Sequence, residues 1–166
     1  MIVIALAVKL TSTGPVLHWS DRVGRANRNF RMPKFRSMRT DAPQIPTHLL
    51  RNPGTWLTPI GSFLRRTSLD ELPQLFSVLA GQLSLVGPRA ALFNEHDLIA
   101  LRTRSRIHEL TPGITGWAQV NGRTQISLSE KVRLDNEYLR SRSLWFDLRI
   151  LTLTVAKVAR REGISH

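Results

Sequence analysis

Residues 67–74 read Thr67-Ser68-Leu69-Asp70-Glu71-Leu72-Pro73-Gln74, and the rest of the chain is organised around this stretch. It places two adjacent carboxylates, Asp70 and Glu71, directly after the arginines Arg65 and Arg66. A second basic turn, residues 84–89, follows closely and ends in Arg89. Acidic side chains held between arginines at the predicted start of a helix favour phosphate chemistry, because free backbone amides there attract anions.

The predicted helix runs from Leu69 to about Leu79, and Gly81 ends it. Its periodicity predicts that four apolar side chains are buried, namely Leu72, Leu75, Phe76 and Leu79.

Two starts fit this helix. In the first, Ser68 and Glu71 form a capping box across the first turn. In the second, Asp70 is the cap and Pro73 lies in the first turn. The N–H groups of that turn have no acceptor within the helix, so proline, which lacks this group, costs no hydrogen bond there. Both starts place Asp70 at a helix N-terminus.

The composition bounds the class of protein. A chain of 166 residues with 42% hydrophobic residues predicts one folded domain. Twenty-four basic against twelve acidic residues give a net charge of +12, which indicates anionic partners: nucleic acid, acidic lipid headgroups or phosphorylated substrates. The absence of cysteine excludes disulfides and cysteine zinc sites, and the five histidines lack metal-ligand spacing. No signal peptide is visible, so we expect the protein to face the cytoplasm.

The first eight residues, Met1 to Val8, are wholly apolar. A membrane-crossing helix needs ~20 apolar residues, so this segment is too short to span a bilayer. It fits a buried strand, the tail of a longer membrane helix, or an interfacial anchor.

Two strands, Pro15 to Trp19 and Phe30 to Met38, are predicted to pair across a polar connection. Pro33 favours an edge position for the second strand. Lys34 and Arg36 lie two residues apart, so an extended chain would project both cations from one face. They then either flank an anion or simply reach water.

The remaining elements are mostly helical. Residues 40–59 are predicted to be a loop, and residues 114–120 to be extended. Helices are predicted over residues 62–66, 90–109, 129–140 and 144–161. The last of these carries apolar residues on one face and four cations, a pattern that suits either docking on a membrane surface or packing on the core. The fold class is therefore α+β, mainly helical, with a small β-hairpin or sheet.

Six motifs occur in an order that resembles one family. They are Gly14-Pro15-Val16, Arg22-Val23-Gly24, Lys34-Phe35-Arg36-Ser37-Met38, residues 65–74, residues 84–89, and residues 112–123, Pro-Gly-Ile-Thr-Gly-Trp-Ala-Gln-Val-Asn-Gly-Arg. Together they resemble the bacterial sugar transferases, the monotopic phosphoglycosyl transferases. The resemblance runs from about residue 3 to the C-terminus.

The resemblance implies a reaction. Family members move a sugar phosphate from a UDP-sugar to undecaprenyl phosphate and release UMP, the first membrane step in building O-antigen, capsule, exopolysaccharide or glycoprotein glycans. The Asp-Glu dyad of the family matches Asp70 and Glu71, its aspartate forms a covalent intermediate with the sugar-bearing phosphate, and Mg²⁺ is required. The family's basic residues match Lys34, Arg36 and Arg89.

The resemblance also implies a place in the cell, the cytoplasmic face of the inner membrane. The family begins with a longer apolar segment that enters the membrane and turns back at a Ser-Pro kink, and only Met1 to Leu10 corresponds to it here. We therefore expect residues 1–10 to be a truncated remnant of the membrane-associated segment and residues 11–166 to be the catalytic domain.

The residue types suit this chemistry. A carboxylate that attacks phosphorus must stay ionised, and we expect nearby arginines to hold the pKa of Asp70 down. Glu71 points about 100° away on a helix, so it either assists through the metal or only caps the helix. Magnesium bound by Asp70 and Glu71 would offset the charge of the substrate phosphates. The candidate phosphate ligands are Lys34, Arg36, Arg65, Arg66, Arg89 and Arg123, of which Arg123 serves equally well as a structural cation.

Two other functions fit parts of the sequence. A basic nucleic-acid-binding module explains the charge but not the acidic pair at a helix start. The aromatic residues also show no regular interleaving with the basic ones, so no nucleic-acid partner is expected. An inactive membrane-associated fragment is compatible with the short apolar start. Release of UMP from a UDP-sugar separates the transferase from both.

Overall fold

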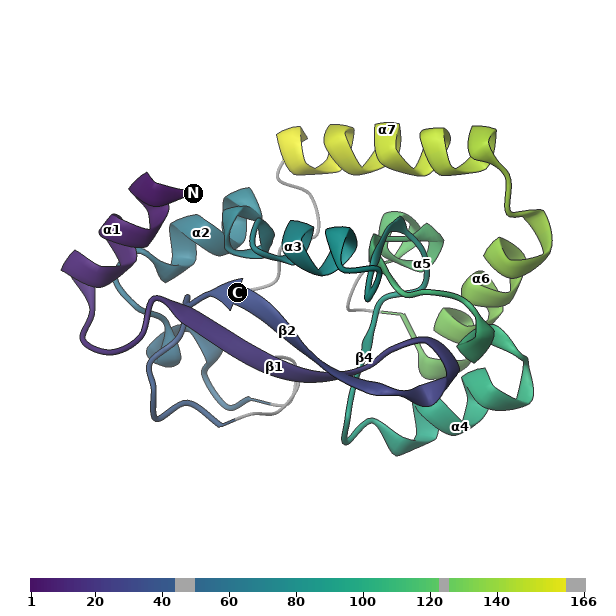
Figure 1. The fold of residues 1–166 in the computed structure, drawn as a ribbon, viewed down its shortest axis with the longest axis horizontal. Helices are drawn as coiled ribbons and strands as arrows, with labels where there is room; N and C mark the ends of the chain where they lie inside the picture. The colour runs from purple at the N-terminus through teal and green to yellow at the C-terminus, as the bar shows by residue number, and fades with distance from the viewer. Residues whose placement is uncertain (44–49, 123–125, 161–166) are drawn as a thin grey trace.

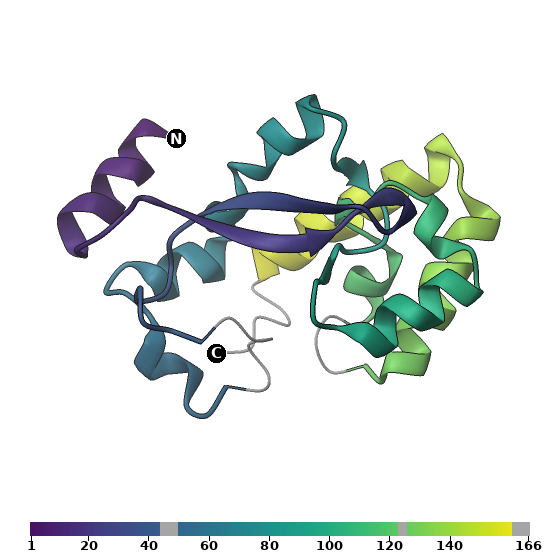
Figure 2. The same cartoon turned by 60° about the horizontal axis from the view of Figure 1, so that its bottom comes forward.

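The structure is a computed structural model that describes residues 1–43, 50–122 and 126–160. The long hairpin of β1 (Leu17–Val23) and β2 (Asn29–Phe35) runs along the middle of the molecule (Figures 1 and 2), and the 3-10 turn η1 (Arg25–Asn27) joins its strands. Helices α1 (Ile2–Thr11) and α2 (Gly61–Thr67) lie at one end of the hairpin, and α4 (His96–Arg104) and α6 (Leu128–Ser141) lie at the other. Helix α7 (Leu144–Arg160) extends along one side.

Two small sheets carry the backbone of the site. In the first, β1 lies between β2 and β4 (Ala91–Leu92), and all pairs are antiparallel. In the second, β3 (Ser84–Val86) pairs in parallel with β5 (Gly113–Thr115). Strand β2 is an edge strand, as Pro33 predicted, because proline has no N–H to donate to a further strand. The predicted α+β class with a small hairpin-based sheet is confirmed.

The core is divided into three clusters. Val8, Phe35 and Leu64 join α1 to β2 and α2. Met32 of β2 packs with Leu83 and Ala90, which directly precede β3 and β4. The largest cluster packs α6 and α7 on the second sheet, and its buried members are Val86, Leu110, Val120, Tyr138 and Ile150.

The helix predicted from Leu69 to Leu79 is broken. Residues 69–71 form the 3-10 turn η4 (Leu69–Glu71), and α3 (Gln74–Leu79) begins only after Pro73. Pro73 cannot donate a backbone hydrogen bond inside a helix, so the chain restarts there. The prediction of Gly81 as the end is confirmed, since Ala80 is the C-cap and Gly81 follows with a φ of +72°.

Both predicted helix starts are wrong. Ser68 has a φ of +55° and its side chain makes no capping hydrogen bond, because this residue ends α2 in a left-handed turn. The cap of α3 is Pro73, so Asp70 caps neither element and instead lies inside η4. The predicted burial is also wrong for three of the four apolar residues: Leu75, Phe76 and Leu79 are exposed.

Two further predictions are corrected. The helix predicted over residues 90–109 begins only at His96, because Ala91 and Leu92 pair with β1, and a separate 3-10 turn η5 (Ile107–Glu109) follows α4. The segment predicted as extended over residues 114–120 is a strand only to Thr115. It continues as the short helix α5 (Trp117–Asn121).

The other helices agree with the sequence. Helices α2, α6 and α7 occupy the predicted ranges to within two residues, and Ser127 caps α6 by accepting from the amide of Glu130. The loop over residues 40–59 contains one 3-10 turn, η3 (Pro53–Trp56), and residues 44–49 lie outside the described part. The apolar start is helix α1, so the strand alternative is wrong. No helix in the described ranges combines the length and apolar character needed to cross a membrane.

Candidate active site

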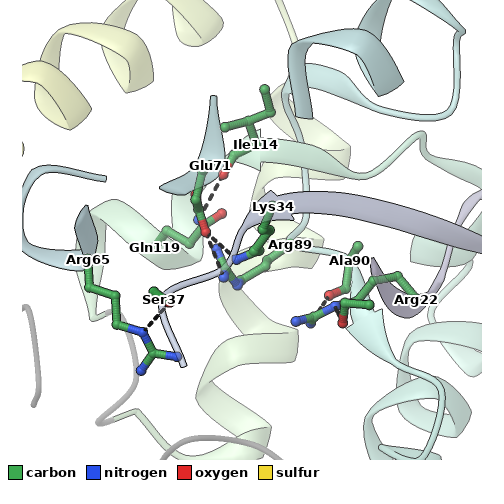
Figure 3. Close-up of polar contacts among 10 residues, drawn as sticks. Arg22, Lys34, Ser37, Arg65, Glu71, Arg89, Ala90, Ile114 and Gln119 are labelled. Carbon is green, nitrogen blue, oxygen red and sulfur yellow. Dashed lines mark hydrogen bonds and ion pairs between the residues drawn. The ribbon is translucent and has the colours of Figure 1, made fainter. Parts of the chain in front are cut away.

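Glu71 is the centre of the polar contacts in the site. Its Oε1 atom accepts from Lys34 Nζ at 2.7 Å and from Arg89 Nη2 at 3.2 Å, as Figure 3 shows. The three residues come from η4, from β2 and from the segment that joins β3 to β4. Burial opposes ionisation of Glu71, but Lys34 and Arg89 outweigh it and hold the pKa of Glu71 well below its usual range.

Asp70 lies beside this cluster but remains outside its hydrogen bonds. The residue is only 7% exposed, and within the described ranges no group donates a hydrogen bond to its carboxylate. Burial raises the pKa of Asp70 above its usual value, Lys34 acts in the opposite direction, and the negative charge of Glu71 adds to the rise. The predicted lowering of this pKa is therefore wrong, because desolvation exceeds the effect of the neighbouring cations.

A cleft of about 740 Å³ opens at this point. Lys34, Asp70, Glu71 and Arg89 all line it. The dimensions suit a small-molecule substrate, since such sites commonly enclose ~300–1,000 Å³. The predicted acidic pair and four of the six predicted cations, Arg36 and Arg65 included, therefore line one cavity.

The other predicted cations occupy different places. Arg65 lines the cleft and donates from Nε to Ser37 Oγ at 3.1 Å. Arg66 is exposed and does not line the cleft. Arg123 lies outside the described residues.

Arg36 follows the end of β2 at Phe35 and lines the same cleft as Lys34. The guanidinium of Arg36 is buried and donates to the backbone carbonyls of Ser12 and Thr13, where helix α1 ends. These hydrogen bonds tie it to α1.

Close backbone packing holds the segment before Arg89 against β5. The Gly87 amide donates to the Thr115 carbonyl at 2.9 Å, and the Gly113 amide donates to the Pro88 carbonyl at 3.0 Å. A Cβ atom built on Gly116 would lie 2.0 Å from the Gly87 carbonyl oxygen, so this approach requires glycine. The glycines of the two predicted turn motifs thus bring the segment that carries Arg89 against β5.

Several residues of the site had no predicted role. Arg22 donates to Ser20 Oγ and to the Ala90 carbonyl, and burial lowers its pKa to about 10. Gln119 donates to the Ile114 carbonyl at 3.1 Å and faces the cleft (Figure 3). Both residues belong to motifs quoted above, so membership of those motifs was the sequence signal that could have identified them. Arg102, which binds the Arg89 carbonyl, belongs to none of them.

The donor set fits a magnesium ion only in combination with a substrate. No group of three or more metal-ligating side chains occurs in the described ranges. Magnesium is commonly held by one or two carboxylates together with substrate phosphates and water. Asp70 and Glu71 supply two such carboxylates at the cleft, and the Asp70 carboxylate has no competing hydrogen bond within the described part of the chain.

Comparisons with known proteins agree on one family. Residues 1–161 match the family model described as bacterial sugar transferase. A UDP-glucose:undecaprenyl-phosphate glucose-1-phosphate transferase of Xanthomonas campestris pv. campestris is 45% identical, covering 95% of this chain and 34% of that protein. The protein of the same name from Escherichia coli (strain K12) is 44% identical, with coverages of 93% and 35%.

A shorter relative covers more of its own length. The uncharacterized sugar transferase EpsL of Bacillus subtilis (strain 168) is 45% identical over 96% of this chain and 77% of that protein. By contrast, the chain spans about a third of the length of the two glucose-1-phosphate transferases.

Proposed function

The chain belongs to the bacterial sugar transferase family, and from this premise we propose that it transfers a sugar 1-phosphate from a UDP-sugar to undecaprenyl phosphate and releases UMP. The observation that carries the proposal is that two adjacent carboxylates, one held by cations and one without hydrogen bonds in the described part of the chain, line the same cleft. Glu71 is held by Lys34 and Arg89, whereas the adjacent Asp70 is buried and makes no hydrogen bond within the described residues. The names of two relatives favour glucose as the sugar.

Asp70 is the proposed nucleophile. One of its oxygens attacks the phosphorus that bears the sugar, the bond from that phosphorus to the oxygen shared with the α-phosphate breaks, and UMP leaves with the electron pair. The resulting acyl phosphate joins Asp70 to the sugar phosphate. A phosphate oxygen of undecaprenyl phosphate then attacks the same phosphorus, and the Asp70 carboxylate is released.

Glu71 and its two cations orient the groups around this reaction. Because Glu71 is ionised and fixed by Lys34 and Arg89, it serves as a support rather than as a second nucleophile. Lys34 and Arg89 also face the cleft, where their charges offset those of the pyrophosphate and of the leaving UMP. Arg65 lies close enough to act on the pKa of Asp70 and is the next candidate for phosphate binding.

Magnesium is the proposed cofactor. Asp70 and Glu71 would hold the ion together with phosphate oxygens of the substrate. Bound there, it would stabilise the negative charge that builds up on the transferring and leaving phosphates.

A membrane surface is the proposed location, on the cytoplasmic face of the inner membrane. Helices α1, α3 and α7 lie on the same side of the hairpin in Figure 1 and carry many exposed apolar side chains. These are Ile2, Val3, Leu6, Leu10, Leu75, Phe76, Leu79, Leu144, Trp145, Leu148 and Val155. Exposed apolar patches of this extent mark binding surfaces, and a lipid acceptor requires access to a bilayer. In this proposal residues 1–10 belong to the membrane-associated part and residues 11–166 to the catalytic domain.

The test is UMP release from UDP-glucose by the full chain in the presence of undecaprenyl phosphate and magnesium. We expect Asp70→Asn to lose at least about 10³-fold in rate, since removing a covalent nucleophile removes the pathway itself. Without the lipid acceptor, mass spectrometry of the unmodified chain should find a sugar phosphate on the peptide that contains Asp70. Arg133→Met, which changes an exposed ion pair on α6, is the matched control and should keep full activity. Absence of UMP release would favour an inactive fragment or a binding module.

A further inference from the structure

The segment that carries Arg89 has no regular structure of its own, yet its backbone is firmly held. Three successive carbonyls each accept a hydrogen bond: Pro88 from the Gly113 amide at 3.0 Å, Arg89 from Arg102 Nη1 at 2.7 Å, and Ala90 from Arg22 Nη1 at 3.0 Å. Figure 3 shows the contact of Arg22 with Ala90 next to Arg89. Two of these three donors are arginine side chains, so the segment depends on side-chain contacts as well as on its backbone contacts with β5.

Arg102 is fully engaged in this role. Its Nε and Nη2 atoms donate to Asp135 Oδ2 at 2.9 and 2.6 Å, while Nη1 donates to the Arg89 carbonyl. Arg102 is 8% exposed and Asp135 is 1% exposed. Charge-assisted hydrogen bonds of this kind are strong and directional, so Asp135 fixes the orientation of the guanidinium and thereby of the nitrogen that binds Arg89. Every guanidinium nitrogen of Arg102 therefore already has a partner within the protein.

We propose that Arg102, oriented by Asp135, is a positioning residue for the active site and that it acts through Arg89. The Arg89 side chain is long and half-exposed, and its contact with Glu71 sets the geometry of the carboxylate beside the nucleophile. A long side chain reaches a defined point only if its Cα is fixed, and displacements of about 1 Å at a reacting centre can cost roughly 10²-fold in rate. The inference rests on the proposed function, because it assigns Arg102 to the same reaction.

The variant must remove the contact without unfolding the chain. Arg102→Met alone leaves the buried Asp135 charge without its partner, which destabilises a fold strongly. The double change Arg102→Met/Asp135→Leu removes both charges and keeps similar volumes, which is the kind of replacement that buried ion pairs tolerate. The matched control is Glu130→Leu/Arg133→Met, which removes an exposed ion pair from the same helix as Asp135.

A double-mutant cycle with Arg89 tests the inference. We measure kcat, KM and Tm for UMP release by the full chain, by Arg89→Met, by the Arg102→Met/Asp135→Leu pair and by the triple variant. The pair should lower kcat about 10- to 100-fold with a smaller change in KM, and the control should keep the activity of the unmodified chain. The triple variant should be no more than about twofold slower than Arg89→Met, because the contact acts only through Arg89.

Three results would overturn the inference: activity of the folded pair within about twofold of the unmodified chain, losses that multiply in the triple variant, or unchanged activity of Arg89→Met. If the unmodified chain releases no UMP, the proposed function fails. NMR then tests the positioning of Arg89 without an activity measurement. The guanidinium NMR signal of Arg89, identified by its loss in Arg89→Met, should then move toward that of free arginine in the pair. An unchanged signal would rule out the positioning role.

Discussion

At the scale of single residues, the site depends on a contrast between two neighbours. Asp70 and Glu71 are chemically similar, but the pKa of Asp70 is raised and that of Glu71 is lowered. Burial acts on both, and only Glu71 has two cations bonded to its oxygen. Environments that shift the pKa values of two carboxylates in opposite directions commonly give the two groups different roles in catalysis. In the proposed reaction they separate a fixed support, Glu71, from the reactive group, Asp70.

The pH dependence of the proposed reaction follows from these pKa directions. Asp70 must be ionised to attack, so kcat/KM should fall on the acid side at a pH above the 3.8 of an ordinary aspartate. Burial lowers the pKa of Lys34, so the alkaline decline should begin below 10.5. Glu71→Gln removes a negative neighbour of Asp70 and should shift the acid limb toward lower pH. Rate profiles of both proteins decide this, and a fixed acid limb would contradict it.

The same burial predicts that Asp70 destabilises the folded protein. Because Asp70 binds its proton more tightly in the folded than in the unfolded chain, its ionisation costs folding free energy at neutral pH. Asp70→Asn should therefore stabilise the protein by about 1 kcal/mol, or roughly 2–4 °C in Tm, at pH 7–8. The gain should disappear as the pH falls below the usual range of aspartate, where both residues are neutral. Thermal melts at pH 7.5 and pH 3.5 measure this, and a lower Tm for the variant at pH 7.5 would disprove it.

At the scale of secondary-structure elements, helical periodicity predicted α2, α6 and α7 because those segments contain no internal proline. The stretch around Asp70 did not follow its pattern, since Pro73 divides it and the left-handed Ser68 ends α2. Periodicity also did not predict that Leu79 is 85% exposed. An apolar stripe on a helix does not indicate whether the stripe packs on the protein core or faces another apolar environment.

The motifs marked residues that the fold brings to one cleft, among them Lys34, Asp70, Glu71 and Arg89, and the roles of these residues stay predictions. Arg36 also lines the cleft, but its hydrogen bonds to the Ser12 and Thr13 carbonyls were not predicted, because alternation along a strand does not reveal tertiary contacts. The contact between Arg102 and Arg89 was not predicted, since nothing in the spacing of two arginines indicates that one binds the carbonyl of the other.

The contact between the two short turns at Gly87 and Gly116 leads to a test of the element packing. Gly116→Ala would place a Cβ 2.0 Å from the Gly87 carbonyl oxygen and force β3 and β5 apart. We expect a loss of about 3 kcal/mol in the free energy of unfolding. Gly54→Ala is the matched control, because a Cβ there meets no atom within 4 Å, and it should leave stability nearly unchanged. Denaturant unfolding compares the two, and equal stabilities would refute the packing argument.

At the scale of the whole molecule, apolar and basic character occur together. The net charge is +12, and exposed apolar side chains gather on α1, α3 and α7. Such a surface suits a bilayer that contains anionic lipids, because apolar side chains enter the interface while cations attract the headgroups. The two alternatives for α7, core packing and surface docking, are compatible: Ile150 is buried, while Trp145 and Val155 are exposed.

Vesicle flotation tests the proposed membrane surface. Phe76→Ser/Leu79→Ser replaces two exposed apolar side chains of α3 and should weaken binding to vesicles containing anionic phospholipid by about tenfold or more. Phe93→Ser is the control, since Phe93 is 44% exposed but follows β4 and belongs to none of these three helices. Equal losses for both variants would contradict a surface confined to α1, α3 and α7.

The attachment of α1 has a practical consequence for the preparation of this protein. Val8 packs against Phe35 and Leu64, and Arg36 binds the carbonyls that end the helix. Deleting the first eleven residues to obtain a more soluble protein would expose the apolar side chains of Phe35 and Leu64 and remove the helix that precedes the Ser12 and Thr13 carbonyls bound by Arg36. Replacing the exposed side chains Ile2, Val3 and Leu6 by polar ones should raise solubility and leave the packing of Val8 on Phe35 and Leu64 unchanged.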